Sequence, residues 1–389
     1  MTTSTPEDGF YEERSALYYP YIHIRSETWL KSALLAFQKV SRIVPSVYTL
    51  WDGDAIQRYS DICGLDGTPL LDRANSQTGR VRRAQDTLFI KLREHESILI
   101  SRYSCGRTPE DFRVGEKAFQ IHRMKLLDYR FTEWLVSSKL AWNVRGSGED
   151  GSYEWLTMHP RLASAIMSVL ALAIARQDGL SIVTPSQTTH ETLLASTQEQ
   201  VLSRLLDMPE FLEDEGAGRV SVQELCQVVL VTGFDLTRLT PEDIGEVIRK
   251  GSVELRKFYG GLTRFAANIP AGLDEPTRAK KLRSKAEEVL ADWRQCMEKL
   301  PQLKEAVKEG ASDKGLEKAV DLAREAGAAK SIAHFVGGLP GLALAVLVKA
   351  GSVMVRKRDT PYSFLNRVES IIDKRIGTLY VPQWRELAN

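Results

Sequence analysis

Three of the six histidines lie where a predicted β-strand ends, and this placement is the main feature of the sequence that suggests a catalytic or binding site. His23 belongs to the end of an alternating stretch at residues 17–25, His159 follows a second predicted strand, and His190 follows a third at residues 180–184. Imidazole is the side chain whose ordinary pKa lies closest to neutral pH, so it commonly donates or accepts protons in catalysis. The ends of these strands are therefore the first place to look for a site.

Parallel strands would bring these histidines together, because ligands of open α/β sheets bind at the carboxyl ends of the strands. The residues that we predict to line this edge, and to bind a ligand there, are His23, Arg25, Asp52, Asp54, His159, Ser186 and His190. Arg25 and two helix starts would hold an anion or a nucleotide-like ligand, with the histidines or Asp52 as acid and base. The alternative is that polar residues at strand ends serve only the solubility of the loops.

Other motifs do not support a known chemistry. Residues 146–151 read GSGEDG, which matches the GxGxxG of dinucleotide sites, but they precede a predicted strand and carry two acids that would repel phosphate. We interpret them as a loop. The histidines lack metal-ligand spacing and the four cysteines form no CxxC pair, so we predict no metal site and assign no cofactor.

The elements that must position this edge are alternating strands and helices. Residues 17–25 alternate as a strand does, and Ser26 begins a helix whose apolar stripe runs to Val44 before Pro45. Residues 46–51 then read as a second strand, which suggests a parallel crossover unit. Since Pro20 has no amide hydrogen, we expect the first strand at a sheet edge or with an irregular start.

A second unit of this kind is predicted at residues 153–184, with a strand, a helix over residues 160–176 and a strand over residues 180–184. Residues 162–175 are nearly all apolar, and about twenty residues are needed to span a bilayer, so we expect a buried core helix. Two further helical segments are predicted at residues 83–103 and 124–141.

Helices dominate beyond residue 189, so the predicted fold class is an α/β N-terminal domain, with a partly parallel sheet and crossover helices, followed by a mainly α-helical C-terminal region. Thr240, Pro241 and the acids after them form a strong helix start. The expected regions are a mixed α/β domain at residues 10–195, an acidic linker-like and short helical region at 196–240, a paired-helix arm at 241–330, and an apolar segment with closing helices at 331–389.

A heptad seam at residues 282–307 predicts coiled-coil packing. Its members are Leu282, Ala286, Val289, Trp293, Cys296, Leu300, Leu303 and Val307. The helix that begins at Pro241 is the favoured partner, and a second copy of the chain or another protein is the alternative. Pro301 should kink the seam or divide it into two helices.

Composition excludes some functional classes. Lys and Arg total 52 against 51 Asp and Glu, which leaves a net charge of +1 and no general attraction for nucleic acid or anionic lipid. The basic regions at residues 78–107 and 349–375 lack interleaved aromatics, so they give no strong nucleic-acid signal.

Separated cysteines and a polar start without signal-peptide character predict a cytoplasmic protein. Residues 332–355 are apolar with basic residues after them, but glycines and a proline interrupt the run, so a buried core segment is favoured over membrane contact.

Three stretches together resemble a family of bacterial proteins of unknown function. They are LYYPYIHIRSETWLK with its continuation to RIVP, the segment from WLTMHP to SIVT, and LTPEDIGEVIRKGSVELRKF with the later TPYSFL. The resemblance implies a bacterial, intracellular protein and transfers no residue role. Relatives often carry an acid where this chain has Pro185 after Thr184.

These observations favour a ligand-sensing or protein-interaction component, in a bacterial stress or phage-defence setting. The first alternative is a hydrolase that acts at the strand-end edge. The second is an effector that acts on membranes through residues 332–355.

Overall fold

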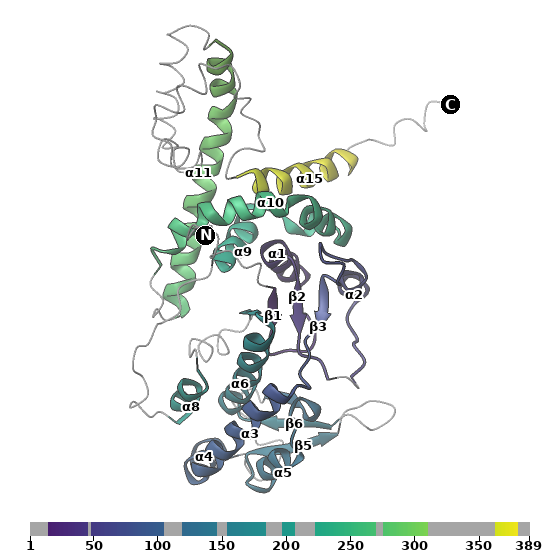
Figure 1. Cartoon of the computed structure of the whole chain (residues 1–389), viewed down its shortest axis with the longest axis vertical. Coiled ribbons are helices and arrows are strands. Elements are labelled where there is room, and N and C mark those ends of the chain that lie inside the picture. Colours follow the sequence, from purple (N-terminus) through teal and green to yellow (C-terminus); the bar gives the residue numbers. More distant parts are fainter. Residues whose placement is uncertain are drawn as a thin grey trace, which may run out of the picture. The chain divides into compact units, whose positions relative to one another are not determined.

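The computed structural model describes residues 15–45, 48–104, 119–145, 154–183, 197–206, 222–269, 275–309 and 362–379 (Figure 1). Contacts divide the chain into two compact units. The first unit comprises residues 1–33, 37–218 and 271–275, and the second comprises residues 34–36, 219–270 and 276–389. The predicted fold class is confirmed, because a parallel sheet with helices lies in the N-terminal part and the C-terminal part is helical.

The first unit is built on a four-stranded sheet in which every neighbouring pair is parallel. The strand order is β3-β2-β1-β7, from β1 (Ala16–Tyr18), β2 (Val40–Arg42), β3 (Leu71–Arg73) and β7 (Ser181–Val183). Helix α1 (Glu27–Phe37) connects β1 to β2, and α2 (Asp54–Asp61) connects β2 to β3. The chain moves from β1 towards β3 in one direction, while β7 lies on the other side of β1. The order therefore reverses at β1, which is where such sheets bind ligands.

Two strand predictions near the N-terminus are wrong in detail. Gln38 adopts a left-handed backbone conformation, with φ 65°, and α1 ends before it instead of running to Val44. The second strand therefore lies at residues 40–42, where β-branched residues begin, and residues 48–50 are not a strand. The predicted edge position of the first strand is also wrong: β1 lies between β2 and β7, and it ends before Pro20, so the proline removes no donor from the ladder.

Helix α6 (Pro160–Asp178) is the buried core helix that the sequence predicts. Its residues from Leu162 to Leu170 are all buried, including two serines. Tyr19 at the end of β1 hydrogen-bonds to Ser168, with 2.5 Å between the two oxygens. Gly179 ends the helix in the left-handed conformation that glycine tolerates best, with φ 64°, and β7 begins two residues later.

A second, antiparallel sheet has the order β4-β6-β5 and comprises β4 (Phe119–His122), β5 (Ala141–Arg145) and β6 (Glu154–Met158). The prediction that the strand before α6 is a parallel neighbour of β1 is therefore wrong, because β6 pairs antiparallel with both of its partners. The short helix η2 (Arg123–Lys125) and helix α5 (Tyr129–Ser137) connect β4 to β5. The GSGEDG loop falls outside the described residues.

Helices α3 (Gly79–Glu94), α4 (Glu96–Tyr103) and α8 (Gln198–Leu206) also belong to the described part of the first unit. Thr78 caps α3 by accepting a hydrogen bond from the amide of Val81 at 3.3 Å. Tyr103 donates from its hydroxyl to the carbonyl of Leu205 at 2.6 Å, which ties α4 to α8. The segment that looks linker-like in sequence thus begins with a helix that packs on this unit.

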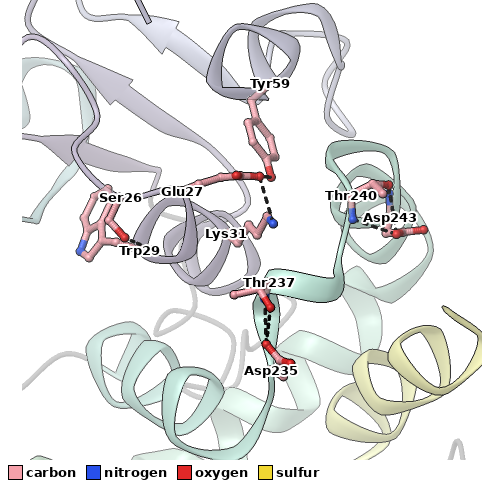
Figure 2. A network of polar contacts seen from close by, with 9 residues as sticks. All are labelled: Ser26, Glu27, Trp29, Lys31, Tyr59, Asp235, Thr237, Thr240 and Asp243. Atoms are coloured by element: carbon pink, nitrogen blue, oxygen red, sulfur yellow. Dashed lines mark hydrogen bonds and ion pairs between the residues drawn. The ribbon is translucent and has the colours of Figure 1, made fainter. Parts of the chain in front are cut away.

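The described residues of the second unit form helices. These are α9 (Val222–Gly233), η4 (Leu236–Arg238), α10 (Pro241–Ala266), α11 (Glu275–Glu309) and α15 (Ser363–Leu379). The predicted start of α10 is confirmed, because Thr240 and Asp243 form a reciprocal capping box (Figure 2). The apolar residues on one side of this helix are buried: Ile244, Val247, Ile248, Leu255, Phe258, Tyr259 and Leu262.

The N-terminal half of the heptad seam is buried within the unit. Leu282, Ala286, Val289 and Trp293 are at most 5% exposed. The Trp293 indole donates to the side chain of Asn366 at 2.9 Å, and its ring lies 5.4 Å from that of Phe234. Helix α11 continues past Pro301 as one helix, so the predicted division is not observed.

Within the described part of the chain, no helix combines the length and apolarity that crossing a bilayer requires. Residues 332–355 lie outside that part.

Candidate functional site

The segment between β1 and α1 places His23 at the carboxyl edge of the parallel sheet. Tyr18, the last residue of β1, donates from its hydroxyl to the backbone carbonyl of His23 at 3.1 Å. Burial raises the pKa of Tyr18 to about 12, so this hydroxyl keeps its proton at neutral pH. Ser26 then caps the start of α1 by accepting from the amide of Trp29 at 3.2 Å (Figure 2). Both contacts fix the backbone on which His23 is presented.

The segment between β2 and α2 places Asp52 against His23. One carboxylate oxygen of Asp52 lies 3.2 Å from His23 Nδ1, and the other lies 2.6 Å from Nη1 of Arg42, the last residue of β2. The side chains of Arg42 and Asp52 are only 3% and 1% exposed. A carboxylate this deeply buried needs a cation beside it, and Arg42 supplies one. Two predicted site residues from two different strand ends therefore meet.

Tyr48 extends this arrangement on the other side of the imidazole. Its hydroxyl lies 3.0 Å from His23 Nε2. A carboxylate only accepts hydrogen bonds, so Nδ1 carries the hydrogen that faces Asp52. In the neutral imidazole Nε2 is then the acceptor, and the Tyr48 hydroxyl donates to it.

Aromatic rings from the antiparallel sheet surround Tyr48. The centroid of its ring lies 5.3 Å from that of His122 in β4 and 6.0 Å from that of Trp155 in β6, both in edge-on contacts. His122 accepts on Nδ1 from the amide of Met124 at 3.2 Å. Burial, with the nearby charge of Lys125, lowers the pKa of His122 to about 4. This imidazole is therefore neutral at pH 7.

Lys125 is a second buried base near this edge. Its side-chain amine donates to the carbonyl of Pro20, just beyond β1, at 3.1 Å, and the residue is 3% exposed. Burial lowers the pKa of the amine to about 7. Gln85 in α3 holds the backbone on both sides, by donating to the Lys125 carbonyl and accepting from the Leu127 amide.

Arg25 offers a positive charge at the same edge. The residue is exposed, and its guanidinium carbon lies 3.5 Å from the centroid of the Tyr21 ring. Tyr21 in turn stacks on Phe119 at 5.9 Å. We see no ion pair of Arg25 within the described residues, so its guanidinium hydrogens remain available to an anion.

The helix starts contribute less to an anion site than the sequence suggests. Glu27 stands in the first turn of α1, where it pairs with Lys31 at 3.0 Å and accepts from the hydroxyl of Tyr59 (Figure 2). Asp54 occupies the first turn of α2 and is exposed. Because each helix start already carries a carboxylate, an incoming anion would depend on Arg25.

The predicted site residues divide into three groups. His23 and Asp52 are in contact, with Arg25 two residues along the chain and Asp54 two residues beyond Asp52. His159 follows β6 of the other sheet, where it caps α6 by accepting from the amide of Arg161 and faces the ring of Tyr103 at 5.0 Å. Ser186 and His190 lie outside the described residues.

The sequence reasoning misses several residues that the fold brings to this edge: Arg42, Tyr48, His122, Lys125 and Trp155. Arg42 carried a usable signal, because a lone cation inside the apolar run of residues 40–44 needs a buried carboxylate as partner. The others come from segments whose pairing a single sequence does not reveal.

No group of three or more His, Cys, Asp or Glu side chains in the described part of the chain is arranged to hold a metal ion. No protein-family model, curated protein or solved structure matches the chain.

Proposed function

We propose that the first unit is a ligand-sensing module of a bacterial intracellular protein, and that it binds an anionic, nucleotide-like ligand at the carboxyl edge of the parallel sheet. The observation that carries the proposal is the contact between His23 and Asp52, which joins the ends of β1 and β2 at the point where the strand order reverses. The His23 side chain is 38% exposed, so a ligand can reach it.

Arg25 supports an anion as the ligand. An exposed guanidinium held against a tyrosine ring is already restricted before an anion binds, so it loses little conformational freedom on binding. The ring leaves the charge unneutralised, whereas the buried Arg42 is already paired with Asp52.

The second unit would carry the response, through a protein partner or a second copy. Leu282, Ala286, Val289 and Trp293 of the seam are buried within the unit, so such a contact would use other residues of the unit. A stress or phage-defence setting suits a sensor with a helical output domain. Co-purification of the full chain from a bacterial host would test for such a partner.

Binding is tested by isothermal titration of the full chain with ATP, GTP, NAD⁺ and inorganic phosphate. We expect at least one of these probes to bind, and Arg25→Ala to weaken it about tenfold. Arg93→Ala is the matched control, because Arg93 is also exposed over an aromatic ring, that of Phe89, but lies in α3. Equal loss in both variants, or no binding by any of the four probes, would contradict the proposal.

A hydrolase at the same edge is the second candidate, and the geometry of His23 favours it. An imidazole oriented by a buried carboxylate and facing a hydroxyl is the arrangement that activates nucleophiles in many hydrolases.

A further inference from the structure

Four side chains form a continuous polar path at the carboxyl edge of the sheet. Arg42 contacts Asp52, Asp52 contacts His23 Nδ1, and His23 Nε2 contacts the Tyr48 hydroxyl. The inner end of the path is buried, whereas the outer end at His23 and Tyr48 is partly exposed. The path thus leads from a fixed charge to a hydroxyl that solvent and ligands can approach.

The direction of the hydrogen bonds along this path favours removal of the Tyr48 proton. Asp52 keeps the hydrogen of the neutral imidazole on Nδ1, which leaves the lone pair of Nε2 directed at the phenol. When the proton moves to Nε2, the imidazolium that forms lies beside the carboxylate of Asp52, which stabilises it. Arg42 holds that carboxylate in place.

The Tyr48 ring is also held in position. The rings of His122 and Trp155 contact it edge-on, which restricts the orientation of the ring and keeps its hydroxyl directed at His23. A nucleophile that is oriented before the substrate arrives avoids part of the entropic cost of the reaction.

We propose that the Tyr48 hydroxyl is a nucleophile toward phosphate esters bound at this edge. This inference rests on the hydrolase candidate above. The Tyr48 oxygen forms a bond to phosphorus, the bond from phosphorus to the leaving oxygen breaks, and His23 passes the phenol proton to that oxygen. Water then attacks phosphorus, His23 takes a proton from this water, and the bond to Tyr48 breaks as the phenol regains a proton. Asp52 and Arg42 are positioning residues.

Arg25 selects the phosphate ester over a neutral ester. It stands two residues from His23 with an exposed guanidinium, and guanidinium recognises phosphate oxygens well.

An arylsulfonyl fluoride tests the nucleophile without knowledge of the substrate. On reaction the Tyr48 oxygen bonds to sulfur, the bond from sulfur to fluorine breaks, and fluoride leaves. We would treat the full-length protein at pH 7 with 4-(2-aminoethyl)benzenesulfonyl fluoride and measure labelled peptides by mass spectrometry. Tyr129 is the internal reference, because it is 64% exposed and is not one of the four residues of the polar path. We expect Tyr48 to be labelled at least tenfold faster than Tyr129.

Variants separate the roles of the path. His23→Gln should reduce Tyr48 labelling at pH 7 at least tenfold and leave Tyr129 unchanged, with circular dichroism as the check that the chain folds. Asp52→Asn should have the same effect at pH 7, but labelling should recover near pH 10, where a phenol ionises without help. A merely structural role of Asp52 would lower labelling at both pH values.

Inorganic phosphate as a competitor tests the substrate class. It should slow the labelling of Tyr48 and not that of Tyr129. If Tyr48 is labelled no faster than Tyr129, the assignment of Tyr48 as a nucleophile is wrong, even if the titrations above find a ligand. Fast labelling without protection by phosphate would overturn the assignment to phosphate esters.

Discussion

The carboxylate of Asp52 contacts both Arg42 and His23, so its replacement should lower the free energy of unfolding. Asp52→Asn leaves the Arg42 charge buried without its partner, and breaking a buried pair in this way costs about 3 kcal/mol or more. We expect the free energy of unfolding, measured by urea denaturation, to fall by that amount. Asp54→Asn is the control, because Asp54 is exposed and should change stability by less than about 1 kcal/mol. Similar losses in the two variants would show that the pair contributes little.

Lys125 should make stability depend on pH above neutrality. The folded chain releases this proton near pH 7, whereas an unfolded lysine holds it to about pH 10.4. The unfolded state therefore binds more protons between these values, and the free energy of unfolding rises with pH by up to about 1.4 kcal/mol per unit.

Lys125→Met removes this contribution. Between pH 7.5 and pH 9.5 we expect the stability of the native chain to increase by about 2 kcal/mol relative to the variant, measured by urea denaturation at both pH values. The comparison with the variant cancels the titration of other groups. Parallel pH dependences of the two proteins would show that Lys125 stays protonated in the folded state.

At the scale of elements, the capping box of α10 is a separable contribution. Thr240→Ala removes the oxygen that accepts from the Asp243 amide, and the loss of such a cap costs about 1 kcal/mol. Thr240→Ser keeps the oxygen and should retain most of the stability. Thermal denaturation followed by circular dichroism distinguishes these variants, and equal effects of alanine and serine would contradict the assignment.

Helices α9 and α11 lie close together at Gly233, where a larger side chain would meet Leu290. A Cβ at Gly233 would lie 2.5 Å from a methyl carbon of Leu290, which is 2% exposed. Gly233→Ala should therefore reduce the free energy of unfolding by about 1–3 kcal/mol, measured by urea denaturation. Adding Leu290→Ala should make the two changes less than additive, because the smaller side chain relieves the overlap. Strict additivity would show that the helices separate freely.

At the scale of the whole molecule, charge balance predicts an absence of general nucleic-acid binding. Lys and Arg exceed Asp and Glu by one, and several cations of the 78–107 region are already engaged, such as Lys91 with Glu94. We expect no binding of a random DNA duplex at 150 mM salt in fluorescence anisotropy. Tight binding that weakens steeply with salt would instead reveal a local basic surface.

Local signals predict much of this architecture. The apolar run of residues 162–175 predicts α6, Thr240 with Pro241 and the acids after them predict the start of α10, and the strand expected before α6 is β6. The errors arise where the backbone conformation of a single residue, which apolar periodicity does not reveal, ends a helix or strand. Gln38 ends α1 early through its left-handed backbone, so the strand forms at residues 40–42 and not at 46–51.

The candidate site is predicted in part for a similar reason. Parallel pairing of β1 and β2 follows from the crossover pattern, and it brings His23 and Asp52 into contact. The sequence places His159 with them because it also follows a predicted strand, but strand direction depends on pairing across the sheet, which periodicity does not encode. His122 and Trp155 reach the edge through that antiparallel pairing, whereas Tyr48 lies on the segment between β2 and α2.

The position of β7 has a consequence for synthesis on the ribosome. A nascent chain that has emerged as far as Arg73 can already pair β1, β2 and β3, but the free side of β1 has no neighbour until Ser181–Val183 emerge. At translation rates of about 5–20 residues per second, this interval lasts on the order of ten seconds. During this interval one side of β1, whose residues are all buried in the folded chain, has no hydrogen-bonded neighbour. Chaperone binding to nascent chains should therefore be strongest when translation stops before residue 181.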